Sequence, residues 1–191
     1  MQPTSIPIVT IVRRCDGCTL CCKLLTIREL NKPGGQDCIH CEDGIGCKAY
    51  SSRPNECRSF LCGYLTSAEL GDEWRPELSR LIISFEFGGR RLVITVDPEY
   101  PDNWRNEPFY SKIKQWGKSA LLQQAQVVVC IGHRTYFILP DRDVDLGELT
   151  EDQLIVVQPR PGPNGPEYDV YTLHKDDPRA KSIPIAEPPA P

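Results

Sequence analysis

The distribution of cysteine constrains this chain more than any other feature of its sequence. Nine of its ten cysteines lie between Arg14 and Gly63, and only Cys130 lies outside that segment. The segment has few periodic apolar residues, and turn residues such as Pro33-Gly34-Gly35 interrupt it. A segment of about 50 residues buries too little apolar surface to hold a fold by itself. We therefore expect disulfides or bound metal to stabilise it.

Net charge and hydropathy argue against several classes of protein. The 191-residue chain has a formal net charge of -4, which argues against a protein that binds nucleic acid by neutralising phosphates. It has no run of about 18 apolar residues, so we expect no membrane-spanning helix. Residues 1–12 lack the basic start and apolar stretch of a secretory signal. We expect a cytoplasmic protein, in which thiols stay reduced and disulfides are disfavoured.

Composition divides the chain into four segments. We expect an N-terminal segment at residues 1–14 and a cysteine-cluster metal-binding module at residues 15–65. A small α+β region packed on that module should follow at residues 66–175, and a disordered proline-rich tail at residues 176–191. The predicted fold class is α+β, with a metal-stapled module of short helices followed by antiparallel hairpins and one helix.

Apolar periodicity predicts the elements of the second half. Apolar residues alternate over residues 81–87, which places Leu81, Ile83 and Phe85 on one face of a strand. Gly88-Gly89 is expected to form a two-residue hairpin turn after it. The other predicted elements are a helix over residues 109–120 and strands over residues 91–96, 127–131, 135–139, 154–158 and 168–173.

The spacing of the first cysteines favours metal ligation over the disulfide alternative. Cys15 and Cys18 are separated by two residues, a gap that lets both sulfurs approach one ion. A helix that starts near Thr19, continues through Ile27 and is ended by Pro33-Gly34 would place Cys18, Cys21 and Cys22 on one face. Adjacent cysteines such as Cys21 and Cys22 seldom reach the same tetrahedral ion. Two four-thiolate sites, or one multinuclear site, are therefore expected.

A second group of cysteines raises a similar question of grouping. Cys57 and Cys62 follow an expected helix start at Pro54. Two side chains five residues apart on one helix point in different directions. Either that helix stops between Cys57 and Cys62, or the two sulfurs bind different ions.

The motif Cys15-x2-Cys18-x2-Cys21-Cys22, with the later run Tyr50-x2-Arg53-Pro54-x2-Cys57-Arg58, resembles the CxxCxxCC cysteine-cluster family, the YkgJ-type zinc- or iron-chelating domain. The resemblance covers roughly residues 15–65 and implies metal chelation. It implies as ligands Cys15, Cys18, Cys21, Cys22, Cys38, Cys47, Cys57 and Cys62. Cys41 falls where an apolar residue is expected and is an additional candidate ligand. A similar pattern is associated with flagellin lysine methylation, but no cosubstrate pocket for that chemistry is evident here.

The spacing of the cysteines is compatible with two cofactors, zinc and an iron–sulfur cluster. Gaps of two residues at Cys15, Cys18 and Cys21 match the start of a ferredoxin-type cluster loop. Paired C-x2-C knuckles, here Cys15/Cys18 and Cys38/Cys41, are typical of zinc. Zinc is the ordinary occupant of a cytosolic thiolate site and is our first expectation, with an iron–sulfur cluster as the alternative. His40, the only histidine of the module, is expected to face solvent.

The chain shows no recognisable catalytic set. It has no Gly-rich phosphate loop and no Gly-x-Ser-x-Gly motif. Cys130 is expected to pack in a core, His133 to lie in a turn and His174 at an exposed strand end. Solvated loops are expected at residues 141–145 and 159–166.

The predicted function is therefore metal binding in a structural or regulatory role, without an identified enzymatic activity. The expected partners are metal ions and a protein, but neither nucleic acid nor membrane. The alternative function is that of an iron–sulfur enzyme or redox protein, acting on a protein side chain as in lysine methylation.

Overall fold

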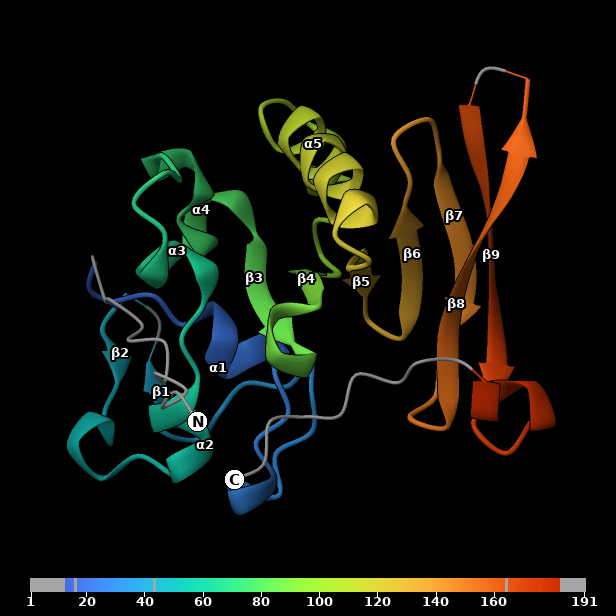
Figure 1. Cartoon of the computed structure of the whole chain (residues 1–191). Coiled ribbons are helices and arrows are strands. Elements are labelled where there is room, and N and C mark those ends of the chain that lie inside the picture. The colour runs from blue at the N-terminus through green and yellow to red at the C-terminus, as the bar shows by residue number, and fades with distance from the viewer. Residues whose placement is uncertain (1–12, 16, 43, 164, 183–191) are drawn as a thin grey trace, which may run out of the picture. The chain divides into compact units, whose positions relative to one another are not determined.

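The computed structural model describes residues 13–15, 17–42, 44–163 and 165–182 (Figure 1). The chain divides into two compact units, with the boundary after Ile83. The fold class is α+β, as predicted. None of the helices in the described residues has the length and apolar character needed to cross a membrane.

The described residues of the first unit form short elements, and the longest helix among them has five residues. The elements that precede its last strand are α1 (Leu20–Leu24), η1 (Arg28–Leu30), β1 (Cys41–Glu42), β2 (Gly46–Cys47), η2 (Tyr50–Ser52), α2 (Asn55–Ser59), α3 (Gly63–Thr66), η3 (Asp72–Trp74) and α4 (Pro76–Ser79). Helix α1 begins after Thr19 as predicted, but it ends at Leu24, well before the predicted end at Pro33-Gly34. The β-branched residues Thr26 and Ile27 disfavour its continuation, and Ile27 instead forms a β-bridge with Lys32.

The apolar core of this unit is shared between the cysteine module and the residues that follow it. Leu20, Leu24 and Ile27 contribute from the front, whereas Trp74 and Leu81 are buried from the later part of the unit. The first residue of α3, Gly63, packs closely against Ile83, because a Cβ at Gly63 would lie 2.7 Å from Ile83 Cγ2. Residues beyond the module therefore complete the unit.

Strand β3 (Leu81–Glu86) contradicts the predicted alternation. Leu81, Ile82 and Ile83 are all buried, whereas Phe85 is 56% exposed. A strand covered on both faces at one end reads as a continuous apolar run, so the period-two pattern misassigned Ile82 and Phe85. The expected two-residue turn is a longer connection that includes η4 (Phe87–Gly89), before β4 (Arg91–Val96).

A five-stranded sheet has the order β3-β4-β5-β6-β7, with β5 at Gln126–Ile131, β6 at Arg134–Ile138 and β7 at Asp143–Glu148. Helix α5 (Phe109–Leu122) forms where helical spacing predicted it, after the short helix η5 (Asn103–Arg105). β4 and β5 are parallel, with α5 in the crossover between them. Only antiparallel hairpins were predicted, because apolar periodicity does not report pairing direction. The β5–β6 pair is antiparallel as expected, with His133 in its turn.

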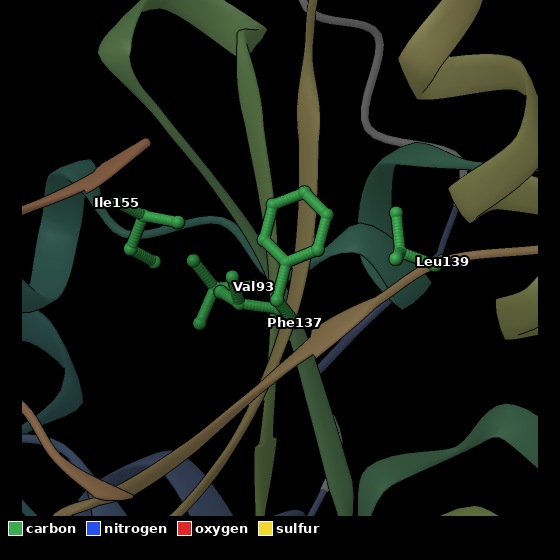
Figure 2. Packing of buried hydrophobic residues seen from close by; sticks show 5 residues of the cluster. Val93, Phe137, Leu139 and Ile155 are labelled. Carbon is green, nitrogen blue, oxygen red and sulfur yellow. The ribbon is translucent and has the colours of Figure 1, made fainter. Parts of the chain in front are cut away.

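Two layers cover opposite faces of this sheet. On one face, α5 approaches β6 so closely that a Cβ at Gly117 would lie 2.9 Å from the Ile138 carbonyl oxygen. The neighbouring residue Phe137 points to the other face, where it packs with Val93, Leu139 and Ile155 (Figure 2). Ile155 belongs to β8, so the C-terminal hairpin covers this second face of the sheet.

The acidic run at residues 141–145 is not the expected solvated loop. Asp143 begins β7, and its side chain is only 7% exposed. Its carboxylate accepts hydrogen bonds from Arg105 Nη1 at 2.7 Å, Tyr110 Oη at 3.1 Å and Lys114 Nζ at 3.0 Å. Donors supplied by η5 and α5 thus allow a charged residue to lie in this strand, which sequence spacing alone did not reveal.

The C-terminal hairpin is longer than predicted. β8 (Gln153–Gly162) and β9 (Gly165–His174) pair through most of the expected loop at residues 159–166. Because each strand of this two-stranded sheet has a free edge, proline is tolerated there. Residues 178–182 form η6 (Pro178–Ser182) with Ala180 buried, where a disordered tail was expected. Residues 183–191 of that predicted tail lie outside the described residues.

Candidate metal centre

Eight cysteines of the first unit line one cavity of about 700 Å³. They are Cys15, Cys18, Cys21, Cys22, Cys38, Cys47, Cys57 and Cys62. These are the eight positions that the family resemblance implies as ligands. Cys41 is not among the residues that line this cavity, although it lies in the same unit. The fold therefore brings the predicted ligand set together around one space.

Short elements present these thiols from different sides. Cys21 and Cys22 lie on α1, and Cys18 precedes the N-cap residue of that helix. The turn between Cys15 and Cys18 passes through Gly17, whose φ of 70° lies in the left-handed region that favours glycine. A tight turn and a short helix thus place four thiols on the cavity wall.

The question of Cys57 and Cys62 is answered by a break between two helices. Helix α2 ends at Ser59, and α3 begins at Gly63 with Cys62 as its N-cap residue. Both sulfurs therefore line the same cavity although they are five residues apart. In β1 and β2, Cys41 pairs with Cys47, and only Cys47 lines the cavity.

All ten cysteines are free thiols in this structure. Burial raises the pKa of the Cys18 thiol to about 12. The pKa of Cys15 is raised by burial and then by Cys62 and Cys22. The pKa of Cys22 is raised chiefly by its neighbour Cys21 and by burial, while Cys41 and Lys32 lower it. These thiols hold their protons at neutral pH, so metal binding would release protons from them.

Electrostatic influence links neighbouring thiols on the cavity wall. Cys15 lies close to Cys18, with its Sγ 4.0 Å from the Cys18 carbonyl oxygen, and it is influenced by Cys62. The pKa of Cys57 is raised by burial and then by Cys22, Cys38 and Cys47. Cys22 influences both Cys15 and Cys57.

The thiols surround the cavity without converging on a point. Within the described ranges, no three or more Cys, His, Asp or Glu side chains are gathered as a metal ion requires. Zinc needs its sulfur ligands at about 2.3 Å. The donor chemistry of the cavity wall fits zinc or an iron–sulfur cluster, and ligation would require the thiols to move inward.

Two basic side chains hold the backbone around the cavity. Arg13 donates to the carbonyl oxygens of Tyr64, at 2.8 Å, Ser67, at 2.7 Å, and Leu70. Its guanidinium also lies 4.3 Å from the centre of the Tyr64 ring. Arg13 therefore connects the residue pair before Cys15 to the segment after Cys62.

Lys32 is the second of these side chains and is 7% exposed. Its ammonium donates to the carbonyl oxygens of Leu25, at 2.6 Å, Pro33, at 3.0 Å, and Lys23, at 3.1 Å. Burial lowers the pKa of Lys32, whereas the thiols of Cys38 and Cys22 raise it. The ammonium is thus a buried positive charge next to the cavity thiols.

Several other residues differ from their predicted positions or were missed. His40 is half-buried and lines the cavity, although it was expected to face solvent. Cys130, in contrast, agrees with its prediction, because it is partly buried and packs against the core of the second unit, with its Sγ 3.8 Å from Thr135 Oγ1. The roles of Lys32 and Arg13 carried no signal in the sequence, because their partners are backbone carbonyls.

Comparisons with known proteins do not assign the chain to a family. No family model, no curated protein and no solved structure matches it. Its function must therefore be inferred from its own cysteines and the cavity that they line.

Proposed function

We propose that the first unit binds metal through the cavity thiols, in a structural or regulatory role. The observation that carries this proposal is the placement of eight cysteines around one cavity, whereas Cys41 lies next to Cys22 and Cys47 without lining it and Cys130 lies in the second unit. Eight thiols supply two four-ligand centres. The adjacent pair Cys21 and Cys22 fits two centres better than one, since neighbouring residues seldom reach the same tetrahedral ion.

The size of the cavity favours an iron–sulfur cluster as the second candidate. A zinc ion occupies little space between four converging sulfurs, whereas a cluster contributes iron and sulfide atoms of its own between separated thiolates. A cavity of about 700 Å³ has room for such a group. On this alternative the protein is a redox protein or an iron–sulfur enzyme.

The test is the metal content of the full chain purified under reducing, anaerobic conditions. We expect at least about one zinc or iron per chain, with broad visible absorbance only if the metal is an iron–sulfur cluster. Cys47→Ser should lower the metal content because Cys47 lines the cavity, whereas the matched variant Cys41→Ser should retain it. A wild-type chain without zinc or iron would contradict the proposal.

A further inference from the structure

The cavity wall contains an arginine whose side chain stacks on an aromatic ring. Arg53 is half-buried and lines the cavity, as does Tyr50. The guanidinium carbon of Arg53 lies 4.1 Å from the centre of the Tyr50 ring, which is a cation–π contact. The Tyr50 side chain is 55% exposed, so it does not belong to the apolar core of the unit. Its contact with Arg53 positions the guanidinium at the cavity wall.

Local structure fixes the backbone around this contact. Tyr50 begins η2, and Arg53 is the C-cap residue of that short helix. Arg58 of α2 donates from its Nε to the Arg53 carbonyl oxygen at 2.8 Å. Pro54 is the N-cap residue of α2, which contains the cavity residue Cys57. Arg53 and Cys57 thus reach the cavity from one continuous stretch of chain.

Stacking on the ring leaves the hydrogen-bond donors of Arg53 available. A guanidinium stacks through its face, whereas its five N–H groups point outward in its plane. Among the residues that the structure describes, none accepts a hydrogen bond from this side chain or forms an ion pair with it. Arg13, another half-buried arginine of the wall, donates instead to backbone carbonyl oxygens. Arg53 therefore has donors to offer to a group inside the cavity.

Metal binding would place negative charge beside this guanidinium. Four thiolates around one Zn²⁺ leave two negative charges uncompensated. Hydrogen bonds donated to metal ligands strengthen metal binding. Burial and neighbouring thiols raise the pKa of Cys15 and of Cys57, whereas the positive charge of Arg53 lowers it at both thiols. The charge of Arg53 thus favours the thiolate form on two separate segments of the wall.

We propose that the guanidinium of Arg53, positioned by the Tyr50 ring, donates hydrogen bonds to thiolate sulfurs of the metal-loaded cavity and offsets part of their charge. This inference rests on the function proposed above and adds a residue that stabilises the metal centre without being a ligand. A guanidinium is weakly hydrated and planar, so it suits a half-buried place between a ring and sulfur better than an ammonium does.

The test titrates the full chain anaerobically with Co²⁺, whose thiolate charge-transfer bands report the sulfur ligands. Arg53→Gln should bind Co²⁺ at least about tenfold more weakly than the wild type. Its charge-transfer band should shift to lower energy, because a thiolate without the hydrogen bond gives up an electron more readily. Lys48 provides the matched control, since it is exposed, pairs with Glu42 and does not line the cavity. Lys48→Gln should titrate like the wild type.

Two further variants separate a positioned donor from a general effect on charge or folding. Arg53→Lys keeps the positive charge and should recover part of the affinity. Tyr50→Leu removes the stacking partner and should weaken Co²⁺ binding by itself, but it should add little to Arg53→Gln because both changes remove the same donor. The fluorescence of buried Trp74 checks that each variant is folded.

The outcomes distinguish the role of Arg53 from the proposed function. An Arg53→Gln chain with wild-type affinity and an unchanged band would overturn the inference and leave the proposed function intact. Equal weakening by Lys48→Gln, or fully additive effects of Arg53→Gln and Tyr50→Leu, would also overturn it. A wild-type chain that binds no Co²⁺ would overturn it as well, and the zinc and iron content measured above would then decide the proposed function.

Discussion

The two units of this chain are stabilised in different ways. In the second unit, side chains such as Phe137 and Ile138 are completely buried between a sheet and the layers that cover it. In the first unit, helices of at most five residues surround thiols, and the charged side chains of Arg13 and Lys32 hold the backbone through carbonyl groups. The difference shows that one chain can combine a unit built on a sheet with a large apolar core and a unit of short elements whose backbone is held by buried charged side chains.

Removal of metal should produce the largest difference in stability between the two units. Metal binding to a small cysteine site supplies on the order of 10 kcal/mol at neutral pH. Chelation should therefore unfold residues 15–62, while β4, β5 and β6 keep their structure. Hydrogen exchange measures this as fast exchange in the front segment and retained protection in those strands. Retained protection of the front segment would show that its stability does not depend on metal.

Truncation of the sheet core should have the next largest effect, confined to the second unit. Phe137→Ala removes a completely buried ring and should lower the free energy of unfolding by about 3–5 kcal/mol. Urea denaturation measures the loss, and metal content should remain unchanged. Phe85→Ala is the matched control, because Phe85 is 56% exposed and its truncation should cost less than about 0.5 kcal/mol. Release of metal by Phe137→Ala would show that the two units are energetically coupled.

Loss of the Lys32 ammonium should affect only the first unit. Lys32→Met leaves the carbonyl oxygens of Leu25 and Pro33 without their buried donor and should cost about 2 kcal/mol. The same change removes a positive charge near the cavity thiols, so chelator competition should extract metal more readily. Exposed Lys48 supplies the control, since Lys48→Met removes only a surface ion pair with Glu42. Equal effects of the two substitutions would refute a special role for the buried ammonium.

The smallest expected effect concerns Cys130. Burial raises the pKa of its thiol, so the fraction of reactive thiolate at pH 8 is lower than for a free cysteine and increases only at higher pH. Mass spectrometry of the metal-loaded chain should therefore show slow alkylation of Cys130 by iodoacetamide. Cys130→Ala should leave metal content unchanged and cost roughly 1 kcal/mol. Rapid alkylation of Cys130 at pH 8, or loss of metal in the variant, would contradict its placement in the core.

The sequence predicted those parts of the molecule that depend on local spacing. Apolar periodicity predicted α5, β5 and β6, and a break between Cys57 and Cys62 was one of the two alternatives that the sequence allowed. Each of these features depends on residues that are close in the chain. The family resemblance also implied the set of cysteines that lines the cavity, although their binding of metal stays a prediction.

Features that depend on distant partners could not be predicted. Asp143 lies in a strand because Arg105 and Lys114 supply donors from other elements. The parallel pairing of β4 and β5 depends on the path of the crossover. In each case the decisive neighbour comes from a different element.

The prolines of the C-terminal hairpin have a consequence for how the protein behaves at high concentration. Pro159 pairs with Tyr168, and Pro161 pairs with Pro166, without interrupting the ladder. The ring nitrogens at these positions therefore face the outer edges of the hairpin, where an ordinary residue would present an N–H group. A strand from another molecule that approaches either edge finds carbonyl acceptors but lacks the matching donors at these positions. The far end of the hairpin can thus extend beyond the sheet while offering little template for intermolecular β-pairing.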